Sequence, residues 1–236
     1  MPVVPAGAYQ PFVLERPAPG KPLISITVRV DTFQMDVLPV SNRDFLGFVR
    51  KHPKWQRSAV SRMFADESYL SHWRNDLEYG DSSVANTPVT FVSWFAARAY
   101  CKELGKRLAT LNEWEYAARP ESFGKDRDRL LSLILEWYSK PASTQLTGSF
   151  KNELLCTIAG VCGLHGLVWE WVEDFGSIIA TEDGRTSSSP DSDLFCGGGA
   201  IGSMDPNNYA AFMRFAFRSS LKGAYTIGHL GFRCVK

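Results

Sequence analysis

The stretch NTPVTFVSWFAARAYCKELGKRLATLNEWEYAAR, residues 86–119, decides the fold because it predicts two short helices in succession. The first is expected over 93–108, where Ser93 is a good N-cap residue and Gly105 stops the helix. Its apolar residues recur at helical spacing, which predicts one inward-facing side. The second helix is expected over 110–119.

The helix expected over 110–119 begins with a capping box, since Thr110 is followed three residues later by Glu113. A further helix is expected towards the N-terminus, over 41–52, with Ser41 as its N-cap and Asp44 at the third position.

The rest of the chain predicts little regular structure. Residues 24–35 alternate as a half-buried strand does, 53–88 fit long loops with short helices, and 125–140 predict a fourth helix. Regular helix signals stop after Pro141. Beyond it we expect short strands or turns in GLVWEWVEDF and HLGFRCV, an exposed mobile loop at 177–193 and a surface turn at 203–209. These features predict one α+β domain over residues 1–236, rich in loops and low in regular secondary structure.

Composition excludes several classes of protein. The net charge of +1 gives no electrostatic footprint for nucleic acid. No apolar run is long enough to span a bilayer, so a membrane-spanning protein is not expected. The chain begins MPVVPAG, which lacks the basic and apolar regions of a signal peptide. Composition alone fits either a cytoplasmic protein or a mature form with an added Met.

The five cysteines have no CxxC spacing, which makes a structural zinc site unexpected. They are Cys101, Cys156, Cys162, Cys196 and Cys234. Two interpretations remain open at this point. They are buried small apolar residues, or they form two disulfides and leave one thiol, which would require an oxidising compartment.

Three stretches together resemble one known family. They are residues 86–119, GLHGLVWEWVEDF (163–175) and GGGA…RFAFRSS…GHLGFRCV (197–235), in that order. This arrangement resembles the formylglycine-generating enzymes, also called sulfatase-modifying factors, and MDVLPVSNRDFLGFV (35–49) is similar to an early segment of that family. The resemblance covers most of the chain and implies a single domain related to the C-type-lectin fold.

The resemblance also implies a disulfide between Cys101 and Cys234, and therefore a periplasmic or secreted protein whose signal peptide is not in this chain. Cys196 is then free to pair with Cys156 or with Cys162, and the sequence leaves open which of these bridges forms and whether either does.

Catalytic members of the family carry two cysteines that bind copper. Aligning GGGA and RFAFRSS with the family's motif places Gly202 and Ala210 at those positions. Neither residue offers a thiolate, and Cys196 alone is a poor site for Cu(I). The resemblance therefore implies that formylglycine generation is absent and that no copper is bound.

Two further metals are implied by the family. One branch uses iron on a His cluster, but the four His of this chain are not spaced as such a cluster, so no iron is expected. Active members bind calcium near a WEW turn, where this chain keeps Glu170 but has Leu167 in place of an Asn. Glu170 either contributes to a calcium site, or it accepts loop N–H groups or pairs with Arg214, Arg218 or Arg233.

The remains of the family's pocket predict a binding site lined by Cys196, Gly202, Tyr209, Ala210, Arg214 and Arg218. The two arginines either hold a carboxylate or a peptide backbone of a ligand, or they brace loops against Glu170 or Glu173. Bracing is the favoured interpretation for Arg218.

The resemblance implies a catalytically inactive regulator that binds a periplasmic or membrane protein. Relatives of this kind regulate the type VI secretion threonine-phosphorylation pathway, upstream of a membrane Ser/Thr kinase, and the expected partner is a kinase sensor domain or a lipoprotein. The alternative is an enzyme for oxidative maturation of a secreted peptide or siderophore, with Tyr209 and Cys196 as the residues to test. Carbohydrate binding rests on fold analogy alone, since the paired acid and amide residues of calcium–sugar sites are missing.

Overall fold

The computed structural model describes residues 1–11, 27–139, 154–175 and 206–236. The helices are α1 (Asn42–Lys51), α2 (Trp94–Glu103), α3 (Leu111–Ala118), α4 (Arg127–Ser139) and α6 (Pro206–Ser219), with 3₁₀ turns at Pro53–Trp55, Ser82–Val84 and Pro120–Asp126. The strands are β1 (Val3–Val4), β2 (Gly7–Tyr9), β3 (Val28–Val30), β4 (Phe33–Gln34), β5 (Arg107–Leu108), β6 (Trp169–Glu170), β7 (Leu230–Gly231) and β8 (Cys234–Val235).

The strands pair only in twos, so the sheet content is small. β1 pairs with β4, β2 with β3 and β5 with β8, all antiparallel, whereas β6 and β7 are parallel. Each pair joins segments distant in sequence. These short helices and strands confirm a loop-rich α+β fold with little regular secondary structure.

Helix starts follow the predicted capping residues closely. Ser41 caps α1, and its hydroxyl accepts from the Asp44 N–H. Ser93 caps α2 in the same way, and the capping box of Thr110 and Glu113 is complete at α3. The ends were less well predicted, because α2 stops at Glu103 and not at 108.

The early end of α2 has a local cause. Gly105 adopts a positive φ of 64°, which turns the chain back so that residues 107–108 form β5 against the C-terminal strand β8. Strand pairing also divides the strand predicted at 24–35. Its described part forms two short strands, β3, which pairs with β2, and β4, which pairs with β1.

The expectation that no helix follows Pro141 is wrong, because α6 covers Pro206–Ser219. The surface turn expected at 203–209 contains the sequence DPNN, whose residue types are common in turns. The same residue types also start helices, since proline suits the first helical position. The loop expected at 177–193 lies outside the described residues.

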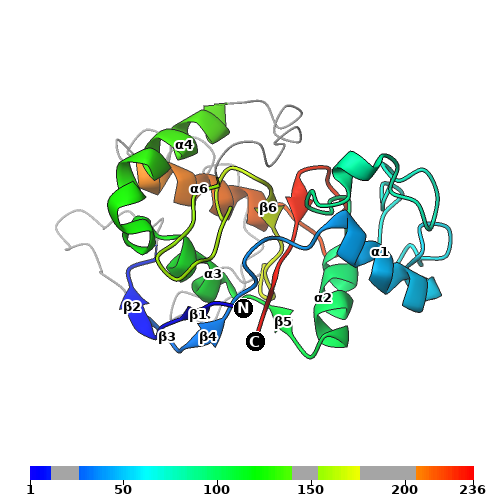
Figure 1. Cartoon of the computed structure of the whole chain (residues 1–236), viewed down its shortest axis with the longest axis horizontal. Helices are drawn as coiled ribbons and strands as arrows, with labels where there is room; N and C mark the ends of the chain where they lie inside the picture. The colour runs from blue at the N-terminus through cyan, green and yellow to red at the C-terminus, as the bar shows by residue number, and fades with distance from the viewer. Residues whose placement is uncertain (12–26, 140–153, 176–205) are drawn as a thin grey trace, which may run out of the picture.

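The C-terminal segment runs between two apolar clusters. Phe232 and Cys234 belong to the cluster beneath α1 and α2, while Val235 belongs to the cluster beneath α3 and α4. Figure 1 shows this segment passing through the middle of the molecule, with α1 and α2 on one side and α3, α4 and α6 on the other. The two chain termini lie close together in the same view.

Two disulfides are present. Cys101 of α2 is joined to Cys234 of β8, and both residues are fully buried. Cys156 is joined to Cys162, and the backbones of these two residues also form an isolated antiparallel β-bridge. The first bridge agrees with the family resemblance. The second decides a pairing that the sequence leaves open, since Cys156 and Cys162 pair with each other and not with Cys196.

No helix within the described ranges has both the length and the apolar character needed to cross a membrane.

Removing the long-range disulfide should destabilise the protein more than removing the short one. Cys101 and Cys234 are 133 residues apart, so in the chain-entropy model their bridge contributes about 5 kcal/mol, whereas the six-residue separation of Cys156 and Cys162 gives about 2 kcal/mol. We expect the double variant Cys101→Ala/Cys234→Ala to lose roughly twice as much free energy of unfolding as Cys156→Ala/Cys162→Ala, measured by urea denaturation. Equal losses from the two double variants would contradict this account of the long bridge.

Candidate functional site

The two arginines of the predicted pocket lie on one face of α6 because they are four residues apart. Both are buried, with 8% of Arg214 and 7% of Arg218 exposed. They converge on Glu115 of α3: Arg214 Nε and Nη2 donate at 2.9 Å and 2.7 Å, and Arg218 Nη1 donates at 2.6 Å. A single carboxylate therefore holds α6 against α3.

The charge of Glu115 is kept by its partners. Burial by itself raises the pKa of a carboxyl group, but the positive charges and hydrogen bonds of Arg214 and Arg218 outweigh it and lower the pKa of Glu115 to about 2. The cluster thus has one partly buried anion between two buried cations, and Glu115 stays ionised throughout the physiological range.

Trp114 joins this cluster to a second buried ion pair. Its indole ring lies 5.4 Å from the Arg214 guanidinium and 5.0 Å from that of Arg218. Its Nε1 donates to Glu170 Oε2 at 2.7 Å. Trp114 therefore contacts the two arginines with the face of its ring and the Glu170 carboxylate with its indole N–H.

Glu170 and Arg233 form the second pair, with 0% and 1% of their side chains exposed. Arg233 Nε and Nη2 donate to the carboxylate at 2.7–3.0 Å. The other guanidinium N–H groups donate to the backbone carbonyls of Asp36, Val37 and Cys162 at 3.1–3.2 Å. Every charge of the pair therefore has hydrogen-bonded partners.

This geometry does not suit calcium at Glu170. Calcium requires six to eight oxygen ligands, whereas both Glu170 oxygens face N–H donors and one of those donors is a cation. Of the alternatives considered for Glu170, pairing with Arg233 is the one observed. Across residues 1–11, 27–139, 154–175 and 206–236, no group of three or more His, Cys, Asp or Glu is placed to hold a metal ion.

His165 lies behind the same cluster as a structural residue. Its Nε2 is 2.8 Å from the Ala118 carbonyl, and its ring packs edge-on against Trp114 at 5.8 Å. Burial, assisted by the positive charge of Arg214, lowers the pKa of His165 to about 4. The ring is therefore neutral at pH 7 and donates from Nε2 to the carbonyl.

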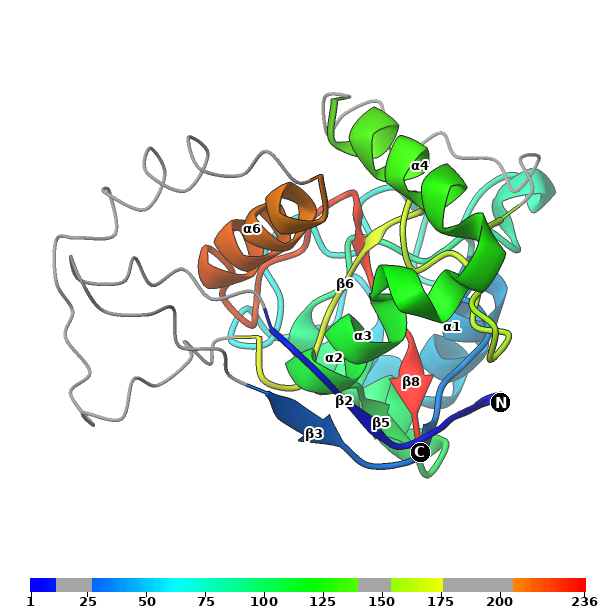
Figure 2. The ribbon, with the colours of Figure 1, turned by 90° about the vertical axis from the view of Figure 1, so that its left-hand side faces the viewer.

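The described side chains leave little room beside α6. A crevice of about 20 Å³ is bordered by Trp114, Trp169, Arg214 and Arg218. A ligand pocket is usually hundreds of Å³, so this crevice is close to the size of one water molecule. Figure 2 shows α6 beside β6 and α4.

The predicted site residues divide into two groups. Glu170, Arg214 and Arg218 come together as described above, although the arginines pair with Glu115 and not with Glu170 or Glu173. Cys196 and Gly202 lie outside the described residues. Tyr209 and Ala210 belong to the beginning of α6, within Pro206–Ser219, and their side chains are also outside the description.

Sequence reasoning missed Glu115. It is 99 residues from Arg214, so no local spacing connects the two residues. The available signal was indirect: two arginines four residues apart require a shared anion if their face is buried. NEWEY offers two acids, Glu113 and Glu115, one on each side of a tryptophan.

The chain is similar along nearly its whole length to one family of domains. A family model described as Sulfatase-modifying factor enzyme 1-like domain matches residues 2–236. A formylglycine-generating enzyme of Mus musculus is 29% identical over 258 residues, which cover 88% of this chain and 66% of the mouse protein. The chain thus spans just under two thirds of that relative.

Two other relatives differ from this enzyme. An inactive C-alpha-formylglycine-generating enzyme 2 of Bos taurus is 34% identical over 118 residues, 39% of each chain. A serine/threonine-protein kinase Pkn1 of Chlamydia trachomatis is 24% identical over 148 residues, which cover 61% of this chain and 23% of the kinase.

The Glu115 cluster predicts a specific pH dependence of stability. Because the pKa of Glu115 falls from 4.5 to about 2 on folding, its ion pairs contribute about 3 kcal/mol above pH 4.5, and this contribution is lost as the pH falls towards 2. We expect Glu115→Gln to lower the free energy of unfolding by about 3 kcal/mol at pH 7, with the difference from wild type shrinking in acid. Chemical denaturation from pH 7 to pH 2.5 measures both.

The matched control is Glu78→Gln, which removes a carboxylate from the exposed Arg74 ion pair. An exposed pair is worth about 0–1 kcal/mol. A Glu115→Gln loss as small as that of Glu78→Gln, or one that does not depend on pH, would contradict the role given to Glu115.

Proposed function

The chain belongs to the family of sulfatase-modifying factor enzyme 1-like domains, and from this premise we propose that it acts by binding another protein and not by generating formylglycine. Three facts support a regulator in an oxidising compartment. They are the number of cysteines, the ion pairs that fill the region beside α6, and the similarity of part of the chain to a protein kinase.

The main support for a function without formylglycine generation is the number of free thiols. The chain has five cysteines, and four of them form the Cys101–Cys234 and Cys156–Cys162 disulfides. Only Cys196 remains. A Cu(I) site needs at least two thiolates or their equivalent, and this chain has one thiol to offer. Gly202 and Ala210, which align with the family's catalytic cysteines, have no ligand atom in their side chains.

The arginines beside α6 support the same conclusion. In an active site they would be available to hold a substrate carboxylate or backbone. Here both donate to the partly buried Glu115, and Trp114 packs against both guanidinium groups. These contacts brace the fold. Recognition is therefore assigned to the surface and not to this interior.

The disulfides favour a periplasmic or secreted location, because such bonds form and persist in oxidising compartments. The proposed partner is the sensor domain of a membrane Ser/Thr kinase or an associated lipoprotein. The C. trachomatis kinase supports a link of this kind, since a region similar to this chain makes up 23% of the length of that kinase. By promoting kinase dimerisation the protein would control type VI secretion.

Direct binding to a kinase sensor domain tests this function. We expect the purified, oxidised chain to bind the extracytoplasmic domain of the Ser/Thr kinase of the same organism with a micromolar Kd, and to shift that domain from monomer to dimer in analytical ultracentrifugation. A reduced and alkylated sample is the control, because loss of both disulfides should abolish binding by unfolding the chain.

Two results would contradict the proposed function. One is the absence of binding at concentrations well above micromolar. The other is stoichiometric copper or iron together with turnover of a peptide or siderophore substrate, which would favour the alternative of an oxidative maturation enzyme.

A further inference from the structure

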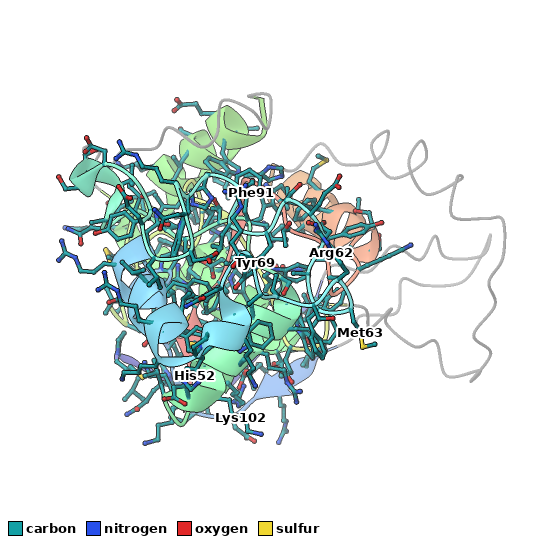
Figure 3. All side chains as sticks on the ribbon, turned by 90° about the vertical axis from the view of Figure 1, so that its right-hand side faces the viewer. His52, Arg62, Met63, Tyr69, Phe91 and Lys102 are labelled. Atoms are coloured by element: carbon teal, nitrogen blue, oxygen red, sulfur yellow. A yellow bond between two sulfur atoms is a disulfide. The ribbon has the colours of Figure 1, made fainter. Side chains whose placement is uncertain are left out.

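A cavity of about 860 Å³ lies between the start of α1, the end of α2 and the loop at 83–87. None of its lining residues belongs to the ion-pair cluster around Glu115. Its size is within the range of pockets that hold ligands, which is roughly 300–1,000 Å³. Figure 3 views the molecule from the α1–α2 side, with His52 and Lys102 marking the C-terminal ends of α1 and α2.

Tyr100 of α2 lines this cavity with a hydroxyl group that has no hydrogen-bond partner among the described residues. Tyr100 is 8% exposed, and its ring packs against Phe45, Phe48 and Phe232 at centroid distances of 5.4–5.8 Å. Its phenol oxygen makes no hydrogen bond to any described residue, and it is open to the cavity and not fully buried. The residue lines the cavity, so a ligand can supply the missing partner.

The charges around Tyr100 favour a cation. Asp36 is neutralised by Lys106, whose Nζ lies 2.7 Å from Oδ1. Asp44 is exposed and pairs with no cation within the described part of the chain. Its Oδ2 accepts from the Ser41 hydroxyl at 2.6 Å, which leaves Oδ1 free. The lining therefore has one uncompensated carboxylate.

The hydroxyl of Tyr100 stays protonated in this setting. Burial, with the negative charges of Asp44 and Asp36, raises the pKa of Tyr100 above its ordinary value. A neutral phenol has lone pairs that accept from a cationic N–H donor, and it still carries a proton to donate. Tyr100 and Asp44 thus present acceptors to the same part of the cavity.

The walls suit the alkyl stem of such a cation. Leu38 and Leu104 line the cavity and are 37% and 50% exposed. Lysine and arginine bury their methylene groups along apolar surface while the charged head contacts polar groups. Ser83 and Asn86 extend the lining with polar groups, which fit the backbone of flanking residues.

We propose that this cavity binds a lysine or arginine side chain from a segment of a partner protein, with its charged head between Asp44 and the Tyr100 hydroxyl and its stem along Leu38 and Leu104. This rests on the proposed function, since it takes the occupant from a protein partner. A segment fits better than a free amine because the cavity is larger than one side chain and its lining also contains the polar residues Ser83 and Asn86.

The test is an NMR titration of the full chain with two capped peptides, acetyl-Leu-Lys-Leu-amide and acetyl-Leu-Glu-Leu-amide. We expect the lysyl peptide to bind at least about fivefold more tightly than the glutamyl peptide, with shifts concentrated at the amides of Asp44, Tyr100 and Leu104. Asp44→Asn should weaken binding of the lysyl peptide by about fivefold, and Tyr100→Phe by about threefold.

Two controls separate binding from folding. Tyr100→Phe should leave the Tm unchanged, because the hydroxyl makes no hydrogen bond to the described residues and the ring contacts remain. Asp128→Asn removes an exposed carboxylate from the first turn of α4, as Asp44→Asn does from that of α1, and should not change binding.

Equal binding of the two peptides, or binding that Asp44→Asn leaves intact, would overturn the proposal. Tighter binding of spermidine than of the lysyl peptide would assign the cavity to free amines and also overturn it. Kinase-domain binding that survives Asp44→Asn would refute this cavity as the contact while leaving the proposed function in place. Peptide binding without kinase-domain binding would count against the proposed function alone.

Discussion

The buried pair of Glu170 and Arg233 is the interaction on which the rest of the structure depends. Removing two charges from water costs several kcal/mol per ion, and only good geometry with further hydrogen bonds offsets that cost. Both conditions are met, because Arg233 also reaches three backbone carbonyls in segments that are otherwise far apart in sequence. The pair fixes the C-terminal segment, the segment after β4 and the strand β6 at one point, one residue from the long-range disulfide at Cys234.

Trp114 extends this fixed point to α6. Its indole N–H is held by Glu170, and its ring supports the two arginines that grip Glu115. A chain with little regular secondary structure thereby gains two buried charge clusters that share one aromatic residue. Since these contacts occupy the arginines, the region beside α6 holds the fold together, and recognition is left to other surfaces.

Local features of the fold could be predicted from the sequence, and distant ones could not. Ser41, Ser93 and Thr110 marked three helix starts correctly, because capping depends on neighbouring residues. The helix α6 was missed because Pro206 and the two asparagines that follow suit both a turn and a helix start. The Cys101–Cys234 bridge was inferred only through the family resemblance.

The partner of the α6 arginines and the cavity at Tyr100 had no local signal. Glu115 is brought to Arg214 by the packing of α6 on α3. Nothing in the sequence around Tyr100 distinguishes it from other residues of α2. In the folded protein its ring is buried, while its hydroxyl opens to the cavity and makes no hydrogen bond to the described residues.

Recognition without metal chemistry is tested most directly by titrating the oxidised, full-length chain with Cu(I) in competition with a chromophoric chelator, alongside a count of free thiols in denaturant. We expect one free thiol per chain, no stoichiometric copper, and no conversion of a cysteinyl peptide to formylglycine. One tightly bound copper per chain held by two thiolates, with turnover of the peptide, would contradict this.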